Sequence, residues 1–296
     1  MNENKTVRPD DIPALIHEAS VRIDRALGEY YTCPDGSPAE LYEAMSYSLL
    51  AGGKRIRPFL TLAFCRAHVG DEEAAVPFAC AIESLHSYSL IHDDMPCLDG
   101  DTVRRGAPTN HVRYGEGTAM LAGDGMQAKA FSIAAENTHV GTDAALDALR
   151  ALAHAAGPDG MVGGQMLDLI GESRRLSRAE LLHMNTLKTC RFISVACELG
   201  CIAAGADKAA RRRAVEYGEA IGLCYQLTDD LLDADTEKAE KTTFLSSGVS
   251  DAVVTVTRYF GGILLGASGL LRAYSTAASE AVHDAGMGTY VADDAL

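Results

Sequence analysis

Apolar residues recur every three or four positions along most of this chain, the spacing of helices that bury one face. Between residues 11 and 30 they include Ile12, Ile16 and Ile23. The pattern predicts helices over 11–30, 38–51, 57–69, 72–94, 117–140, 143–156, 160–172, 178–204, 207–235 and 251–285. No strand series, fixed repeat or linker interrupts it. We therefore expect one all-α domain over residues 1–296, a bundle of about ten or more helices around a central cavity.

Helix starts and loops are marked by local residues. Ser37 with Glu40, and Ser177 with Glu180, have the spacing of capping boxes. Polar, glycine-bearing loops are expected at 99–109 and 236–250.

The net charge of −15, from 26 basic and 41 acidic residues, argues against a nucleic-acid partner. An anionic substrate would need bound divalent cations to offset this charge. The longest uncharged apolar stretch, 259–271, is too short to span a membrane. The eight scattered cysteines and the N-terminus without a targeting segment favour reduced thiols in the cytoplasm.

Three aspartates, Asp229, Asp230 and Asp233, lie in an otherwise apolar helical segment. Carboxylates on a buried helix are costly unless a cation or a proton neutralises them, and hard oxygen ligands favour Mg²⁺. The alternative is a solvated acidic helix end.

A second cluster ends the predicted helix 72–94. Pro96 should break this helix just after Asp93 and Asp94, so that Asp99 can turn back beside Asp93. Two such clusters on separate helices are less readily explained by chance than one.

Basic residues complement these acids. The segment 52–58 places Lys54 and Arg57 at a helix start, where anions bind readily. Arg104 and Arg105 follow the first acidic cluster, and Lys188 lies within a helix. Each alone could be a surface charge. With two Mg²⁺ sites, they would accommodate two polyphosphate groups beside an apolar cavity for hydrocarbon.

The sequence resembles the trans-isoprenyl diphosphate synthases, the family of farnesyl and geranylgeranyl diphosphate synthases, over residues 40–235. The resemblance rests on Gly-Gly-Lys-Arg-Ile-Arg-Pro (52–58), Leu-Ile-His-Asp-Asp (90–94), Asp99, Arg-Arg-Gly-Ala-Pro-Thr (104–109), Ala-Gly-Asp (122–124), Gly-Gly-Gln (163–165), Lys-Thr (188–189), Gln226 and the aspartates 229, 230 and 233. Pro96 and Cys97 match the bacterial and plant form.

The resemblance implies a magnesium-dependent prenyltransferase with the isoprenoid synthase fold, which joins isopentenyl diphosphate to allylic diphosphates such as dimethylallyl and geranyl diphosphate. Three Mg²⁺ ions would be bound with substrate. Their direct ligands would be Asp93, Asp99 and Asp229, supported by Asp94, Asp230 and Asp233. The allylic diphosphate would be held by Arg104, Lys188, Thr189, Gln226 and Lys241. Isopentenyl diphosphate would be bound by Lys54, Arg57, His86 and Arg105, although His86 could also be a packed core residue.

Product length is expected to depend on Tyr88 and Ser89, one turn before the first aspartates. A bulky Tyr88 would form a floor for the growing chain. In the family an aromatic residue here accompanies short products, so we expect farnesyl diphosphate, with geranylgeranyl diphosphate as the alternative. The resemblance also implies a homodimer.

The sequence departs from the family after Asp233, where a Gly-Lys segment is missing before Lys241, and the C-terminus is acidic. Asn185 stands where a histidine is common. Two other functions remain open. One is a non-catalytic regulatory subunit of a prenyl synthase, and the other is a terpene cyclase or squalene-type synthase on the same fold.

Overall fold

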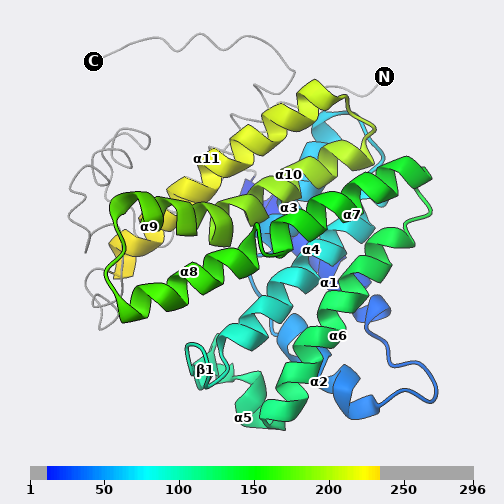
Figure 1. Cartoon of the computed structure of the whole chain (residues 1–296). Coiled ribbons are helices and arrows are strands. Elements are labelled where there is room, and N and C mark those ends of the chain that lie inside the picture. The colour runs from blue at the N-terminus through cyan, green and yellow to red at the C-terminus, as the bar shows by residue number, and fades with distance from the viewer. Residues whose placement is uncertain (1–11, 234–296) are drawn as a thin grey trace. The chain divides into compact units, whose positions relative to one another are not determined.

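The computed structural model describes residues 12–233, and this part of the chain is almost entirely helical (Figure 1). Its elements are α1 (Ile12–Tyr30), α2 (Ala39–Leu49), α3 (Ile56–Ala67), α4 (Glu72–Asp93), β1 (Val103–Arg104), β2 (Ala107–Pro108), α5 (Asn110–Tyr114), α6 (Glu116–Ala135), α7 (Thr142–Ala156), α8 (Met161–Ser173), α9 (Arg178–Asn185), the π-helix η2 (Thr186–Cys190), α10 (Arg191–Ala203) and α11 (Lys208–Asp233). The predicted all-α class is confirmed. Within these residues, no helix is both long and apolar enough to cross a membrane.

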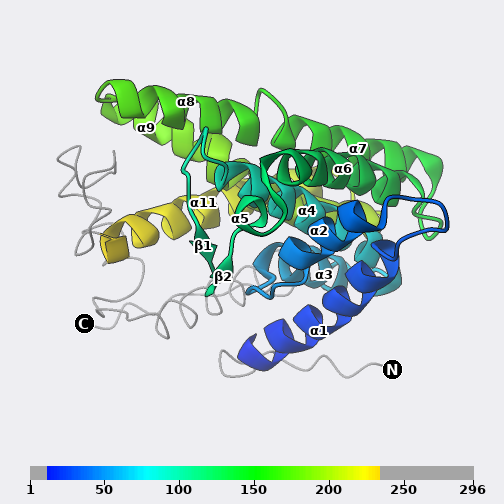
Figure 2. The ribbon, with the colours of Figure 1, turned by 90° about the horizontal axis from the view of Figure 1, so that it is seen from below.

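The described residues fall into two compact units. The N-terminal unit comprises residues 16–152 and 199–205. Its central element is α4, which lies between α3 and α6 (Figure 2). Phe78, Ile82, Leu85 and Ile91 of α4 are at most 1% exposed. A helix with apolar residues on all sides is stable only where neighbours cover it, so α4 forms the core of this unit.

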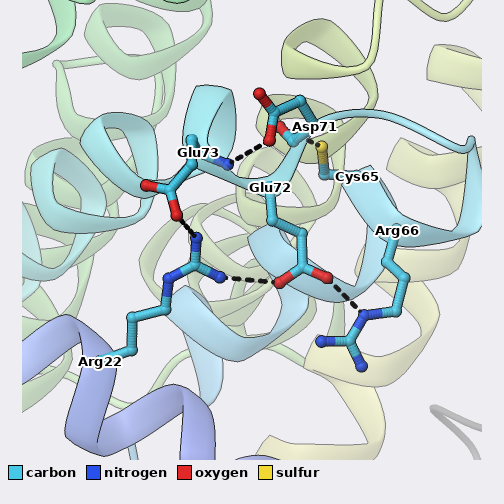
Figure 3. Close-up of polar contacts among 6 residues, drawn as sticks. All are labelled: Arg22, Cys65, Arg66, Asp71, Glu72 and Glu73. Atoms are coloured by element: carbon cyan, nitrogen blue, oxygen red, sulfur yellow. Dashed lines mark hydrogen bonds and ion pairs between the residues drawn. The ribbon is translucent and has the colours of Figure 1, made fainter.

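Charged side chains fix the N-terminus of α4 (Figure 3). Asp71 caps the helix by accepting a hydrogen bond from the backbone N–H of Glu73. Glu72 accepts hydrogen bonds from Arg22 of α1, at 2.9 Å, and from Arg66 of α3, at 2.6 Å. These contacts tie three helices of the N-terminal unit together at one end of α4.

The C-terminal unit comprises, within the described part, residues 12–15, 153–198 and 206–233. The helix predicted over 178–204 is found as α9, η2 and α10, so its middle turn is a wider π-helix. Figure 1 shows this continuous rod between α8 and α11. Both neighbours approach its backbone closely, because a Cβ at Gly164 would lie 2.4 Å from the amide nitrogen of Lys188. A Cβ at Gly222 would lie 2.5 Å from Cα of Cys190.

The loops and helix caps differ in part from the local predictions. The loop predicted at 99–109 contains an antiparallel pair, β1 with β2, whose two-residue strands are too short to show an alternating pattern. The capping box expected at Ser37 is wrong, because Pro38 is the N-cap and no side chain caps the helix. The box formed by Ser177 and Glu180 is confirmed. The predicted loop 236–250 and helix 251–285 lie outside the described residues.

The contact at Gly164 makes a prediction about stability. Gly164→Ala should lower the free energy of unfolding by about 1–3 kcal/mol, because the added methyl group overlaps the backbone of η2. Gly28→Ala is the matched control, since no atom lies within 4 Å of its added Cβ in α1. The control should be neutral or gain up to about 1 kcal/mol. Urea unfolding followed by circular dichroism measures both; equal effects would contradict the packing argument.

Candidate active site

The first aspartate cluster lies where α4 ends. Asp93 is the last residue of the helix, and the backbone N–H of Asp99 donates a 2.9 Å hydrogen bond to the carbonyl of Asp93. The chain therefore turns back after Pro96, as the sequence predicted. Both aspartates are partly exposed at this end of α4.

Asp94 has a different environment, since it is only 3% exposed. Arg104 of β1 donates to its carboxylate from Nε at 2.8 Å, and its Nη2 lies 2.7 Å from the same oxygen. Burial raises the pKa of Asp94 above its ordinary value, although Arg104 acts in the opposite direction. In this structure Arg104, a predicted diphosphate ligand, contacts the acidic cluster itself.

The first acidic cluster fits Mg²⁺ through two of its three aspartates. Within residues 12–233, no three carboxylate, histidine or cysteine side chains converge into a group that could hold a metal ion. Asp94 is occupied by Arg104. Asp93 and Asp99, however, are hard oxygen donors joined by the hydrogen bond between their backbones, a donor set that suits Mg²⁺ better than softer metals. The metal roles of all three residues stay predictions.

The predicted isopentenyl diphosphate residues lie around the loop between α2 and α3. Lys54 is exposed in this loop, and Arg57 lies in the first turn of α3. Arg105, in the turn between β1 and β2, donates a hydrogen bond from its guanidinium to the carbonyl of Gly52. Its backbone is left-handed, with φ at 54°, a conformation that is uncommon for a residue other than glycine. The loop and the hairpin are therefore in direct contact.

His86 of α4 lies beside these cations. Burial lowers the pKa of His86 well below its ordinary value, and the positive charges of Arg57 and Arg105 lower it further. The imidazole is consequently neutral at pH 7. The structure thus brings His86, Arg57 and Arg105 into one electropositive region of the N-terminal unit, next to the loop that carries Lys54.

Sequence reasoning missed the role of Arg55. It counted this residue among the cations of the segment 52–58, yet the side chain is buried and ion-paired with Asp24 and Glu83. No signal in the sequence distinguishes it from Lys54 or Arg57, because its partners lie 31 and 28 positions away.

The remaining predicted polar residues lie in the C-terminal unit. Lys188 of η2 forms a 2.6 Å ion pair with Asp168 of α8, a partner that the sequence did not indicate. Thr189 donates a 3.1 Å hydrogen bond to the amide oxygen of Gln226 in α11. The π-helix that carries Lys188 and Thr189 is a rare kind of turn, and such turns are frequent at functional sites. The structure thereby brings together three predicted allylic diphosphate residues.

The second aspartate cluster continues from Gln226. Asp229, Asp230 and Asp233 occupy the last two turns of α11, as predicted. Lys241 lies outside the described residues.

Tyr88, the predicted floor, is 5% exposed on α4. Its hydroxyl accepts a 3.1 Å hydrogen bond from Gln127 of α6, which fixes the orientation of the ring. Ser89 donates to the carbonyl of His86 at 2.8 Å. His92 contacts the Tyr88 ring edge to face and bonds the carbonyl of Met120, so it joins α4 to α6.

Comparison with known proteins agrees with this geometry. The family model described as polyprenyl synthetase matches residues 38–245, which is more than half of the chain. This chain belongs to the polyprenyl synthetase family. The predicted resemblance is confirmed, and so is the helical fold, which is shared with solved members of the family.

Several members of this family are closely similar to the chain. The farnesyl diphosphate synthase of Geobacillus stearothermophilus is 42% identical over 226 residues, 76% of either chain. The geranylgeranyl diphosphate synthase of Cyanophora paradoxa is 44% identical and covers 68% of this chain and 67% of its own. The solved apo structure of a FPP/GFPP synthase from Zymomonas mobilis is 36% identical, with a TM-score of 0.78 over 90% of this chain and 98% of that one.

A second family model, the Impact N-terminal domain, matches residues 223–282. This match begins just before the second aspartate cluster and extends beyond the polyprenyl synthetase match, which ends at residue 245. The departure from the family seen after Asp233 therefore coincides with a different sequence pattern.

The environment of His86 predicts a pH dependence of stability. An unfolded histidine binds a proton near pH 6.5, whereas folded His86 does so only at much lower pH. The unfolded state therefore binds more protons between these values, so His86 lowers the stability of the fold as pH falls below about 6.5. His86→Asn should flatten the loss of unfolding free energy between pH 7.5 and 5.5. Denaturant titrations of both proteins at each pH measure this slope, and identical slopes would contradict the prediction.

Proposed function

We propose that this polyprenyl synthetase is a short-chain trans-prenyltransferase that condenses isopentenyl diphosphate with dimethylallyl and geranyl diphosphate and releases farnesyl diphosphate. The proposal includes Mg²⁺ as cofactor and a cytoplasmic homodimer. Relatives named farnesyl diphosphate synthase in Geobacillus stearothermophilus, Haemophilus influenzae and Bacillus subtilis support this product.

One observation carries the proposal. The single buried helix α4 holds both an electropositive region, at His86, and an acidic pair, Asp93 with Asp99, at its end. His86 and Asp93 are seven residues apart, so they lie on the same face about 10 Å from each other. The helix thus holds the region at His86, which could bind an anion, apart from the pair Asp93 and Asp99, which could bind a metal-bound anion. Their separation is about the length of a small organic substrate. A protein that only bound a partner would not need both.

The residues would divide the reaction between them. Neutral His86 would donate one hydrogen bond to the diphosphate of isopentenyl diphosphate, while Arg57, Arg105 and Lys54 offset its charge. Lys188, with Thr189 and Gln226, would bind the allylic diphosphate in the C-terminal unit. Bound at the aspartates, Mg²⁺ would stabilise negative charge on the departing diphosphate. The C–O bond of the allylic diphosphate would break, and the apolar side chains of α4 would exclude water from the allylic cation. The double bond of isopentenyl diphosphate would attack this cation, and the condensed chain would then lose a proton to the released diphosphate.

The two alternatives differ from this proposal in what they require. A regulatory subunit would not need the acidic pair, and a cyclase would not need the cation-lined region around His86. Both features are present in the N-terminal unit, which favours the synthase.

The proposed activity can be tested with purified protein, Mg²⁺, radiolabelled isopentenyl diphosphate and geranyl diphosphate. We expect a labelled fifteen-carbon product. Asp93→Asn should lower kcat by about a hundredfold or more, because a charged ligand in the transition state is lost. Asp35→Asn, in the loop before α2, is the matched control and should keep full activity. No incorporation by the parent protein would overturn the synthase assignment.

We expect the side chain of Tyr88 to limit the length of the product. Tyr88→Ala should extend the main product from fifteen to twenty carbons or more, because it removes the ring that would stop the growing chain. Tyr88→Phe keeps the ring and loses only the hydrogen bond from Gln127, so it should make the parent product at a stability cost of about 1 kcal/mol. Thin-layer chromatography of the dephosphorylated products separates the two outcomes. A fifteen-carbon product from Tyr88→Ala would refute the floor.

A further inference from the structure

Arg55 is the most fully enclosed cation of the N-terminal unit's electropositive region. Its side chain is 0% exposed and donates three hydrogen bonds to three different helices. Nε bonds Asp24 of α1 at 2.8 Å, one terminal nitrogen bonds Glu83 of α4 at 2.6 Å, and the other bonds the carbonyl of Leu49, the last residue of α2, at 2.6 Å. Such a guanidinium cannot reach a substrate.

Its backbone belongs to the loop that carries the predicted isopentenyl diphosphate residues. Only residues 50–55 connect α2 to α3, and Arg55 is the N-cap of α3, with a left-handed φ of 47°. Lys54 precedes it and Arg57 follows two residues later. Gly52 and Gly53 of this loop adopt positive φ values that other residues avoid, and Arg55 at its end is held by hydrogen bonds to α1, α4 and α2. The position of Arg55 therefore sets the positions of Lys54 and Arg57.

Glu83 connects this loop to α4, the helix that carries His86. It is 2% exposed and lies three residues before His86, on the same side of α4. An ion pair of 2.6 Å between Arg55 and Glu83 thus fixes the separation between the loop and the turn of α4 that bears His86.

The Arg55–Glu83 pair also affects the charge balance of the electropositive region that contains Arg105. Burial lowers the pKa of Arg105, and the positive charge of Arg55 is the strongest electrostatic contribution in the same direction. Burial would also lower the pKa of Arg55, but the carboxylates of Glu83 and Asp24 raise it above its ordinary value. The negative charge of Glu83 acts against the repulsion by Arg55 and raises the pKa of Arg105, whose guanidinium bonds the same loop at Gly52.

We propose that the buried Arg55–Glu83 pair is a positioning element for isopentenyl diphosphate: it holds Lys54 and Arg57 at a fixed distance from His86 and Arg105 without touching the substrate. This inference rests on the proposed function. It assigns a role in binding to two residues that no part of the reaction uses directly.

The test compares two Glu→Gln variants of α4. Glu83→Gln should raise the KM for isopentenyl diphosphate about tenfold or more, with the KM for geranyl diphosphate within about twofold of the parent value. Glu72→Gln is the matched control, since Glu72 is also bound by arginines from α1 and α3, but at the far end of the helix (Figure 3). It should lower the melting temperature and leave both KM values unchanged.

A purely structural role would give a different result. If a folded Glu83→Gln protein keeps its KM for isopentenyl diphosphate, or if both KM values rise together, the positioning role is refuted. Should Glu83→Gln fail to fold, Asp24→Asn replaces it, because Asp24 holds the same guanidinium from a partly exposed position. That variant should raise the same KM about two- to fivefold, and an unchanged KM would again refute the role.

Failure of the proposed function is a separate outcome. If the parent protein shows no turnover, the synthase assignment is wrong, and calorimetric titration with inorganic diphosphate then tests the pair. Weaker binding by Glu83→Gln than by Glu72→Gln would support a positioned anion site, and equal binding would overturn it.

Discussion

The N-terminal unit depends on a buried ion pair between Arg55 and Glu83, two charges that are each at most 3% exposed. Breaking a buried pair from one side costs about 3–5 kcal/mol, because the remaining charge is left without a partner or water. Such a pair is retained only where the surrounding structure fully satisfies it, and here Asp24 and the end of α2 complete the hydrogen bonds of the guanidinium. The side chain at the N-cap of α3 is therefore bonded to three other helices, α1, α2 and α4. These contacts fix the position of the loop 50–55, which is predicted to bind substrate.

The helix α4 is the other half of this arrangement. Because α3 and α6 cover it on both sides, its path is set by packing along its whole length, from the Glu72 contacts at one end to Asp93 at the other. The polar residues that it carries, Glu83 and His86, are therefore held in an apolar surrounding where electrostatic effects are strong. The same burial keeps His86 neutral beside the arginines and places the carboxylate of Glu83 where it offsets their charge.

The sequence predicted those features that depend on residues close together in the chain. The course of α4 and the return of Asp99 to Asp93 follow from a helical pattern ended by Pro96. The roles of Arg55 and Asp168 do not, since each depends on a partner distant in the chain. The π-turn at Lys188 is equally hidden, because its residues keep a helical pattern and the close contacts arise from Gly164 and Gly222 on other helices. Burial and pairing are tertiary properties, and a run of cations in one sequence does not reveal which member is enclosed.

Arg104 and Arg105 show how far backbone conformation alone can separate two identical side chains. Arg104 lies in β1 and pairs with Asp94, whereas Arg105 has a left-handed backbone and bonds the carbonyl of Gly52. Arg104 ends the short strand β1, whereas Arg105 lies in the turn that follows, and its guanidinium reaches the loop between α2 and α3. One arginine thereby serves the acidic end of α4 and the next serves the cation-lined region around His86. The β1–β2 hairpin, which the sequence pattern did not reveal, carries both arginines and places them at these two different sites.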